Sequence, residues 1–213
     1  HTYSHTIKNE MKKVTNQKSS GRCWGFAGLN LFRIHLGRKY NLKDFQFSQS
    51  YFMFWDKIEK SNYFLESILK TTDHDWNSRL VMHLLSNPIQ DGGQWDMWIN
   101  LVNKYGVVPQ SEMPESFSSS RSSMMNRLIT RKLRENAMIL RNQKTKGASD
   151  ANLQETKIHL LEEIYKMLTI HLGNPPTSFD WQIRDKKRNF IRFDNLTPNF
   201  FNSTIDIFFN SSS

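Results

Sequence analysis

The helical spacing of its apolar residues is the feature that most restricts how this chain can fold. Between residues 151 and 172, apolar side chains recur every three or four positions, and the stretch ends at Gly-Asn-Pro-Pro. This spacing predicts an amphipathic helix, since residues three and four apart share one helical face. The expected buried stripe consists of Ile158, Leu161, Tyr165, Leu168 and Leu172.

Four other stretches show the same period, so the chain is predicted to be mainly helical. One begins just after Gly21, with a stripe of Trp24, Ala27, Leu31 and Ile34. Another starts near Ser48, a third runs from Gln94 and stops at Gly106, and a fourth covers the basic stretch 121–146. Residues beyond Pro176 are rich in Phe, Ile and Asn and are expected to be extended or irregular.

Composition narrows the class of protein further. The 213 residues are 38% hydrophobic and 13% aromatic, enough for one domain with a core or for two small lobes. The single cysteine cannot form an intramolecular disulfide, which favours a reducing compartment, the cytoplasm. No apolar run approaches the ~20 residues that span a bilayer, so no membrane partner is expected. Because the chain starts at His1 rather than Met, it is expected to be a fragment.

The net charge of +9 is concentrated in one stretch. Residues 121–146 carry eight Lys and Arg residues and one acid, Glu135. A solvated helix face is one interpretation, and an anionic partner such as nucleic acid, bound through Arg127, Arg131 and Arg134, is the other.

Cys23 is the candidate nucleophile. Its predicted place in the first turn of a helix favours the thiolate, because the positive end of the helix dipole stabilises negative charge. Arg22 would add a positive charge beside it, and the neighbouring Ser19 and Ser20 are polar rather than core-like. A side-chain amide from Gln17 and the backbone N–H of Cys23 could together form an oxyanion hole.

Other interpretations of these residues stay open at this point. A lone cysteine is usually a small buried hydrophobe, and an Asp-Gly-Gly sequence such as 91–93 is usually a turn. Five histidines show no spacing typical of a metal site and are expected to be surface or satisfied residues: His1, His5, His35, His74 and His83. No metal and no cofactor are therefore expected.

The segment "NQKSSGRCW" resembles the papain-like cysteine proteases and, more closely, the bleomycin hydrolase group of cysteine aminopeptidases. Three other stretches share this resemblance in the same order, 45–64, 87–116 and 172–190, so that it reaches about residue 199. In the secreted papain-like enzymes a disulfide cysteine stands where this chain has Ser20. The resemblance implies that Trp24 flanks the nucleophile and that Gly92 and Gly93 let a peptide backbone approach the cleft.

The implied fold is the α+β papain-like fold, of which this chain would hold the mainly α-helical lobe. Residues 1–116 would form the lobe that carries the nucleophile, 117–175 a helical insertion, and 176–213 an irregular segment before a second lobe. The implied activity is that of a thiol aminopeptidase acting on peptide substrates, and on the amide of bleomycin, through an acyl-enzyme on Cys23. Family members form homohexamers, and some bind nucleic acid.

The chain departs from the family pattern because the catalytic His and Asn are not found. His159 and His171 lie at a suitable distance along the sequence, but both fall inside the helix predicted at 151–172, and no Asn-Ser-Trp-like stretch occurs. The fragment alone is therefore expected to be inactive. The alternative is a non-catalytic relative that binds nucleic acid or joins other subunits.

Overall fold

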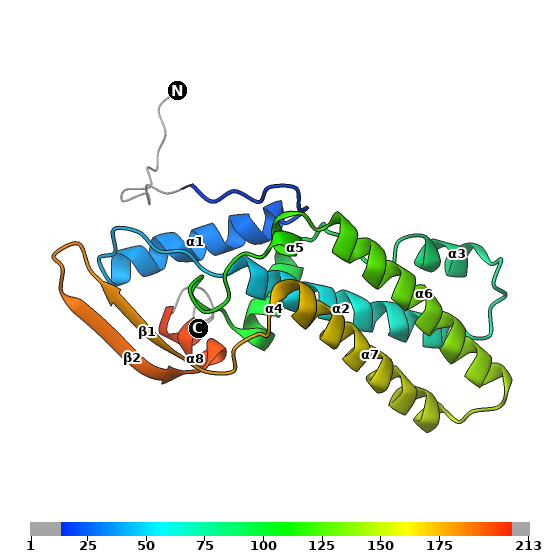
Figure 1. The fold of residues 1–213 in the computed structure, drawn as a ribbon. Helices are drawn as coiled ribbons and strands as arrows, with labels where there is room; N and C mark the ends of the chain where they lie inside the picture. The colour runs from blue at the N-terminus through cyan, green and yellow to red at the C-terminus, as the bar shows by residue number, and fades with distance from the viewer. Residues whose placement is uncertain (1–13, 206–213) are drawn as a thin grey trace, which may run out of the picture.

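The computed structural model describes residues 14–205, and its elements form an elongated, mostly helical molecule (Figure 1). His1 and His5 lie outside this range. The elements in chain order are α1 (Cys23–Lys39), α2 (Gln49–Lys70), α3 (Arg79–Ser86), α4 (Trp95–Tyr105), α5 (Phe117–Ser120), α6 (Ser123–Thr145), α7 (Asp150–Leu172), β1 (Phe179–Arg184), β2 (Phe190–Leu196) and α8 (Pro198–Ile205).

Helix α2 is the central element of the fold. It begins after Ser48, as predicted, where the Ser48 hydroxyl accepts a hydrogen bond from the Tyr51 N–H and caps the helix. Its inner end packs against α1 and α4, and α6 and α7 pack against it and against each other at the other end of the molecule (Figure 1). One continuous apolar core joins these helices. None of the helices within residues 14–205 is long and apolar enough to cross a membrane.

The buried face of α1 differs from the predicted stripe. Ala27 and Leu31 are exposed, whereas the buried side includes Gly25, Gly28 and Leu29. A Cβ at position 28 would lie 2.3 Å from the Trp98 ring, and one at position 25 would lie 2.5 Å from the Phe52 ring. Aromatic rings from α2 and α4 therefore fill the space above the two glycines. The buried face also carries Leu29, Phe32 and Leu36, so large apolar residues lie on more than one side of α1 and their spacing did not select this face.

Helix α7 is also rotated relative to the prediction. Ile158 is 55% exposed, whereas Leu160 and Ile164 are buried, together with the predicted Leu168 and Leu172. Lys157 also lies on the buried side, where its ammonium forms an ion pair with Glu66 of α2. The helix carries apolar residues on more than one face, so the spacing alone did not select the face that packs on α2.

Residues 179–205, within the stretch expected to be extended or irregular, form two extended strands and a helix. Strands β1 and β2 form an antiparallel hairpin in which Trp181 pairs with Phe193, and α8 follows it. Phe201 of α8 is fully buried, with its ring centroid 5.1 Å from Trp181 and 6.1 Å from Phe47. The missed signal in the sequence was the alternation of apolar and polar residues in residues 179–184, which is typical of a strand.

Besides α8, two helices of the described part were not predicted. Helix α3 begins at a Ser78 cap, and α5 forms inside the Ser-rich stretch through a capping box between Ser116 and Ser119. Gly106 ends α4 with a φ of 72°, as predicted for a helix stop. The division of the chain at residues 116 and 175 stays a prediction.

Candidate functional site

Cys23 is the first residue of α1, and its side chain is exposed. The first amides of a helix have no acceptor within the helix. Arg22 at the N-cap provides no side-chain hydrogen bond to them, and the first turn contains no acid. The thiol therefore stands beside backbone N–H groups that are available to an anion.

Gln17 lies at the other end of the short bent segment that leads to Cys23. The Ser20 hydroxyl donates a 2.6 Å hydrogen bond to the Gln17 carbonyl, which closes this bend. Lys18 adopts a left-handed φ of 55°, and its N–H donates to the Asn16 side chain. The Gln17 side-chain oxygen is buried and has no hydrogen-bond partner among residues 14–205.

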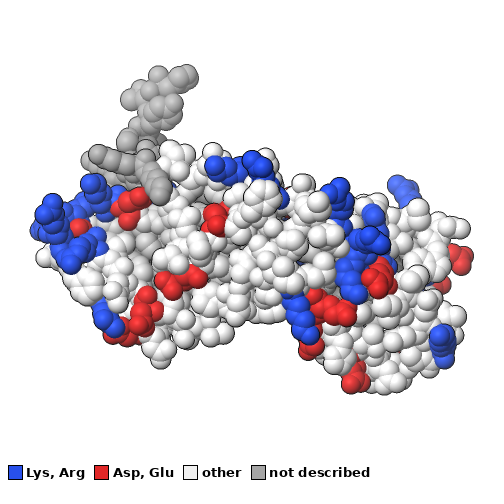
Figure 2. Space-filling view, viewed as in Figure 1, with Lys and Arg blue, Asp and Glu red and all other residues white. Residues whose placement is uncertain are grey.

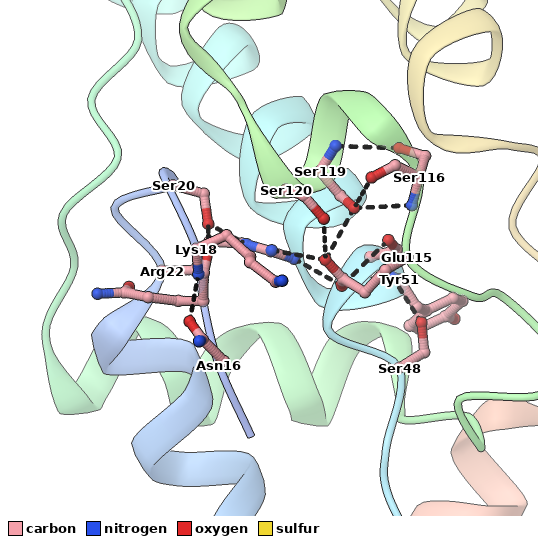
Figure 3. Close-up of polar contacts among 12 residues, drawn as sticks. Asn16, Lys18, Ser20, Arg22, Ser48, Tyr51, Glu115, Ser116, Ser119 and Ser120 are labelled. Carbon is pink, nitrogen blue, oxygen red and sulfur yellow. Dashed lines mark hydrogen bonds and ion pairs between the residues drawn. The ribbon is translucent and has the colours of Figure 1, made fainter. Parts of the chain in front are cut away.

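Arg22 does not face Cys23 as a free cation, which corrects the sequence interpretation. Its side chain is only 4% exposed, and its guanidinium donates two hydrogen bonds to Glu115, of 2.8 and 2.7 Å. Figure 3 shows Arg22, Ser119 and Ser120 converging on the Glu115 carboxylate. Burial alone would raise the pKa of Glu115, but its hydrogen bonds and the Arg22 charge hold that pKa below its usual range. The positive charge of Arg22 is thus neutralised inside the protein.

The loop of Asp91, Gly92 and Gly93 packs directly against Trp24. The Trp24 indole N–H donates a 2.9 Å hydrogen bond to the Asp91 carbonyl. A Cβ at position 93 would lie 2.5 Å from the Trp24 ring, whereas a Cβ at position 92 would have no atom within 4 Å. The absence of a side chain at Gly93 therefore makes room for Trp24, and at Gly92 it leaves open space at the surface.

Two lysines of α2, Lys57 and Lys60, hold this loop in place. Lys57 donates 2.6 Å and 3.2 Å hydrogen bonds to the Asp91 carboxylate and the Gln90 carbonyl. Lys60 donates to the Gln90 and Gly92 carbonyls, both at 2.8 Å. Burial acts to raise the pKa of Asp91, but the Lys57 charge, together with hydrogen bonds from Lys57, Asn126 and the Gly21 backbone, keeps that pKa below normal. The Asp91 carboxylate therefore stays ionised and anchors the loop.

A surface groove of about 580 Å³ runs beside the glycine loop. Its walls come from α2, α3 and the loop itself, and its lining includes Lys60, Tyr63, Leu84, Gln90, Gly92 and Gly93. The roles of four charged residues that hold the glycine loop and the turn before Cys23 were not predicted: Lys57, Lys60, Asp91 and Glu115. The one local signal was that Lys57 and Lys60 lie within an apolar stretch, where charged side chains are usually buried and paired.

The two histidines set aside on sequence grounds have other partners than the cysteine. The His171 ring lies 3.0 Å from the Ser118 hydroxyl, and His159 faces Glu162 at 3.6 Å. Within residues 14–205, the exposed Cys23 thiol therefore has no histidine among its hydrogen-bond partners.

The basic helix α6 carries less free charge than its composition suggests. Lys132 forms ion pairs with Glu135 and Glu163, and Arg141 donates to backbone carbonyls. Arg127, Arg131 and Arg134 are exposed, and Arg134 also donates to the Leu85 and Ser86 carbonyls of α3. Figure 2 shows Lys and Arg along α6 with acidic side chains beside them.

Comparison with known families gives a match over almost the whole chain. The family model described as "Peptidase C1-like family" matches residues 1–211. The match continues past residue 199, where the sequence resemblance was judged to fade.

Curated relatives carry two names, bleomycin hydrolase and aminopeptidase C. The chain is 44% identical to bleomycin hydrolase of Oryctolagus cuniculus over 200 residues, 93% of this chain and 72% of that sequence. It is 47% identical to aminopeptidase C of Listeria monocytogenes over 206 residues, 96% of this chain and 46% of the relative. The human bleomycin hydrolase is 43% identical, with 93% of this chain and 44% of the relative covered. The chain thus spans less than half the length of most of these relatives.

The fold also matches a solved structure. The crystal structure of PepW from Lactobacillus rhamnosis HN001 superposes with a TM-score of 0.91 at 48% identity. The superposition covers 96% of this chain and 45% of the PepW chain. These matches confirm the predicted fold class, an α-rich lobe of the papain-like fold.

Proposed function

Because the chain belongs to the Peptidase C1-like family, we propose that it carries the nucleophile of a cysteine-type aminopeptidase, which removes residues from the N-termini of peptides. The observation that carries this proposal is the exposed Cys23 at the start of α1. The names of the relatives, bleomycin hydrolase and aminopeptidase C, support the same class of reaction.

In the proposed reaction the Cys23 thiolate attacks the carbonyl carbon of the first peptide bond. The backbone N–H of Cys23 and the Gln17 side-chain amide stabilise the negative oxygen that develops. The C–N bond then breaks, and the amine leaves with a proton supplied by a general acid. Water hydrolyses the remaining thioester and regenerates the thiol.

The glycine loop would receive the substrate backbone next to the nucleophile. Open space at Gly92 and the adjacent groove support this role, and Trp24 would form the wall between loop and nucleophile. Gly93 contributes by letting the Trp24 ring lie against the loop.

The proposed reaction also needs a general base and a group that orients it. No histidine is a hydrogen-bond partner of Cys23 within residues 14–205, and we propose that the catalytic His and Asn lie in the part of the relatives' length that this chain does not cover. We further propose a cytoplasmic location, supported by the single, unpaired cysteine. Assembly into a homo-oligomer, a hexamer by resemblance, belongs to the same proposal.

A two-stage experiment tests this function. First, iodoacetamide should label Cys23 in the folded chain at least as fast as it labels a cysteine in an unstructured peptide, since the thiol is exposed. Second, a chimera joins this chain to the part of Listeria monocytogenes aminopeptidase C outside the match. We expect the chimera to hydrolyse aminoacyl amides, and the chain alone to show no turnover.

Variants of the chimera test the proposed roles of Cys23 and Gln17. Cys23→Ser should abolish turnover, and Gln17→Ala should lower kcat by about a hundredfold or more with little change in KM. Gln143→Ala is the matched control, since Gln143 has the same kind of buried, unpaired side-chain oxygen in α6. Turnover by the chain alone, or a fully active Cys23→Ser chimera, would overturn the proposal.

A second candidate function is nucleic-acid binding through α6, and the exposure of Arg127, Arg131 and Arg134 favours it. Affinity for DNA should fall with salt, with a log–log slope that grows by about 0.7–0.9 for each phosphate neutralised. Replacing the three arginines with Gln should flatten this slope. Binding that does not change in the triple variant would exclude this surface.

A further inference from the structure

A chain of hydrogen bonds connects Glu115 to the turn that carries the proposed catalytic residues. The Arg22 guanidinium uses both terminal nitrogens on Glu115 and its Nε on the Ser20 hydroxyl, at 2.8 Å. The same hydroxyl donates to the Gln17 carbonyl at 2.6 Å. We call this series, Glu115 to Arg22 to Ser20 to Gln17, the Glu115 relay.

Each member of the relay is fixed by burial or by several partners. Arg22 and Ser20 are 3% and 6% exposed. The planar fork of arginine binds both oxygens of a carboxylate in parallel while Nε donates to a third acceptor, a fixed geometry that the point charge of a lysine does not provide. Glu115 also accepts hydrogen bonds from Ser119 at 2.9 Å and from Ser50 at 3.3 Å, so its position is set by α5 and α2 together (Figure 3).

The turn depends on such outside contacts because it makes few of its own. Ser19 donates its N–H to the Ser120 carbonyl, and the Ser122 N–H donates to the Ser19 carbonyl. The Gln17 side-chain oxygen is buried and accepts no hydrogen bond from residues 14–205. Its direction therefore follows from the backbone of the turn, which the relay fixes at the Gln17 carbonyl.

We propose that the Glu115 relay is the positioning device of the oxyanion hole, with Glu115, Arg22 and Ser20 as positioning residues. This inference rests on the proposed function. By holding the Gln17 carbonyl at one end of the turn and the residue before Cys23 at the other, the relay fixes the distance between the Gln17 amide and the Cys23 N–H. Misplacement of a catalytic donor by about 1 Å can cost on the order of a hundredfold in rate.

Ser20→Ala is the most selective variant, because it cuts the relay without leaving a buried charge unpaired. In the chimera we expect kcat to fall about tenfold or more while KM changes less than about twofold. Arg22→Lys keeps the charge and loses the fork, and it should show the same split. A merely structural role would lower the melting temperature and the amount of folded enzyme, and would not change kcat per active thiol.

Two matched controls distinguish a positioning role from a general loss of stability. Ser61→Ala removes another buried hydroxyl that donates to a backbone carbonyl, and Arg33→Lys alters another buried arginine with a carboxylate partner, at the other end of α1. Both should leave kcat unchanged. Titration of active thiols normalises every rate.

A second measurement works in the 213-residue chain and needs no turnover. Hydrogen exchange at the amides of Ser19 and Arg22 should accelerate about tenfold or more in Ser20→Ala, while core amides of α2 keep their rates. Unchanged exchange, or a chimera whose kcat is the same as that of the unmodified chimera, would overturn the inference. An inactive unmodified chimera would instead refute the proposed function, and the inference with it.

Discussion

The two adjacent glycines of the loop beside Trp24 should respond in opposite ways to the same substitution. In Gly93→Ala, the new methyl group would lie 2.5–2.7 Å from three atoms of the Trp24 ring. In Gly92→Ala, the methyl group would meet no atom within 4 Å. Both variants add one methyl group to the same loop. A difference in stability between them therefore measures the packing of Trp24 on position 93.

The expected loss of unfolding free energy follows from the contacts that hold the Trp24 ring. The ring cannot retreat without losing its hydrogen bond to Asp91, and its edge contact with Phe52 at 4.9 Å holds it on the other side. Overpacking costs about 1–3 kcal/mol and a lost hydrogen bond about 1 kcal/mol, so we expect Gly93→Ala to lower the unfolding free energy by about 2–3 kcal/mol. Gly92→Ala should be neutral or stabilise by up to about 1 kcal/mol, through the entropy of the unfolded chain.

Urea denaturation followed by far-ultraviolet circular dichroism measures both changes. For a chain of this length, 2–3 kcal/mol corresponds to a drop in melting temperature of roughly 4–12 °C. Equal stabilities for the two variants would refute the assigned packing of Trp24 on Gly93. In the chimera, Gly92→Ala should raise KM for peptides, since its methyl group would stand in the space proposed for the substrate backbone.

The other predictions concern charge and core packing. The lowered pKa of Glu115 means that its stabilisation is complete above the unfolded pKa of about 4.3 and is lost as pH falls through the folded-state pKa; Glu115→Gln should weaken this acid dependence in urea titrations. Ile164→Ala in α7 should cost about 2–5 kcal/mol, and Ile158→Ala less than about 1, by the same denaturation assay; the reverse order would contradict the observed face of α7. Lys60→Met should free the Gly92 carbonyl and accelerate proteolysis of the loop relative to Lys70→Met.

Local signals were enough to predict where several elements begin and end. The Ser48 cap, the Gly106 stop and the position of Cys23 in a first turn all depend on residues within one or two helical turns of each other. The buried faces of α1 and α7 were not predicted, because they are decided by the neighbours that pack on them. Trp98 lies against Gly28, and Glu66 pairs with Lys157, across long separations in the sequence.

The contacts of the candidate site were also only partly predictable from the sequence. Cys23, Gln17 and the glycine pair could be named from short motifs, but Arg22 was read as a free charge beside the thiol. Its partner, Glu115, stands 93 residues further along the chain, and no local pattern connects the two. Buried ion pairs between distant segments become visible only when the tertiary arrangement is known.

The aromatic cluster around Phe201 has a consequence for synthesis on the ribosome. Phe45 and Phe47 pack against Phe201, 6.5 and 6.1 Å away, although more than 150 residues separate them in the sequence. At about 5–20 residues per second, translation of that interval takes roughly 8–30 s. Throughout this time the N-terminal aromatic residues lack the side chain that completes their packing. The nascent chain therefore presents an apolar surface next to α1 during this interval, and chaperones that recognise such surfaces can bind there.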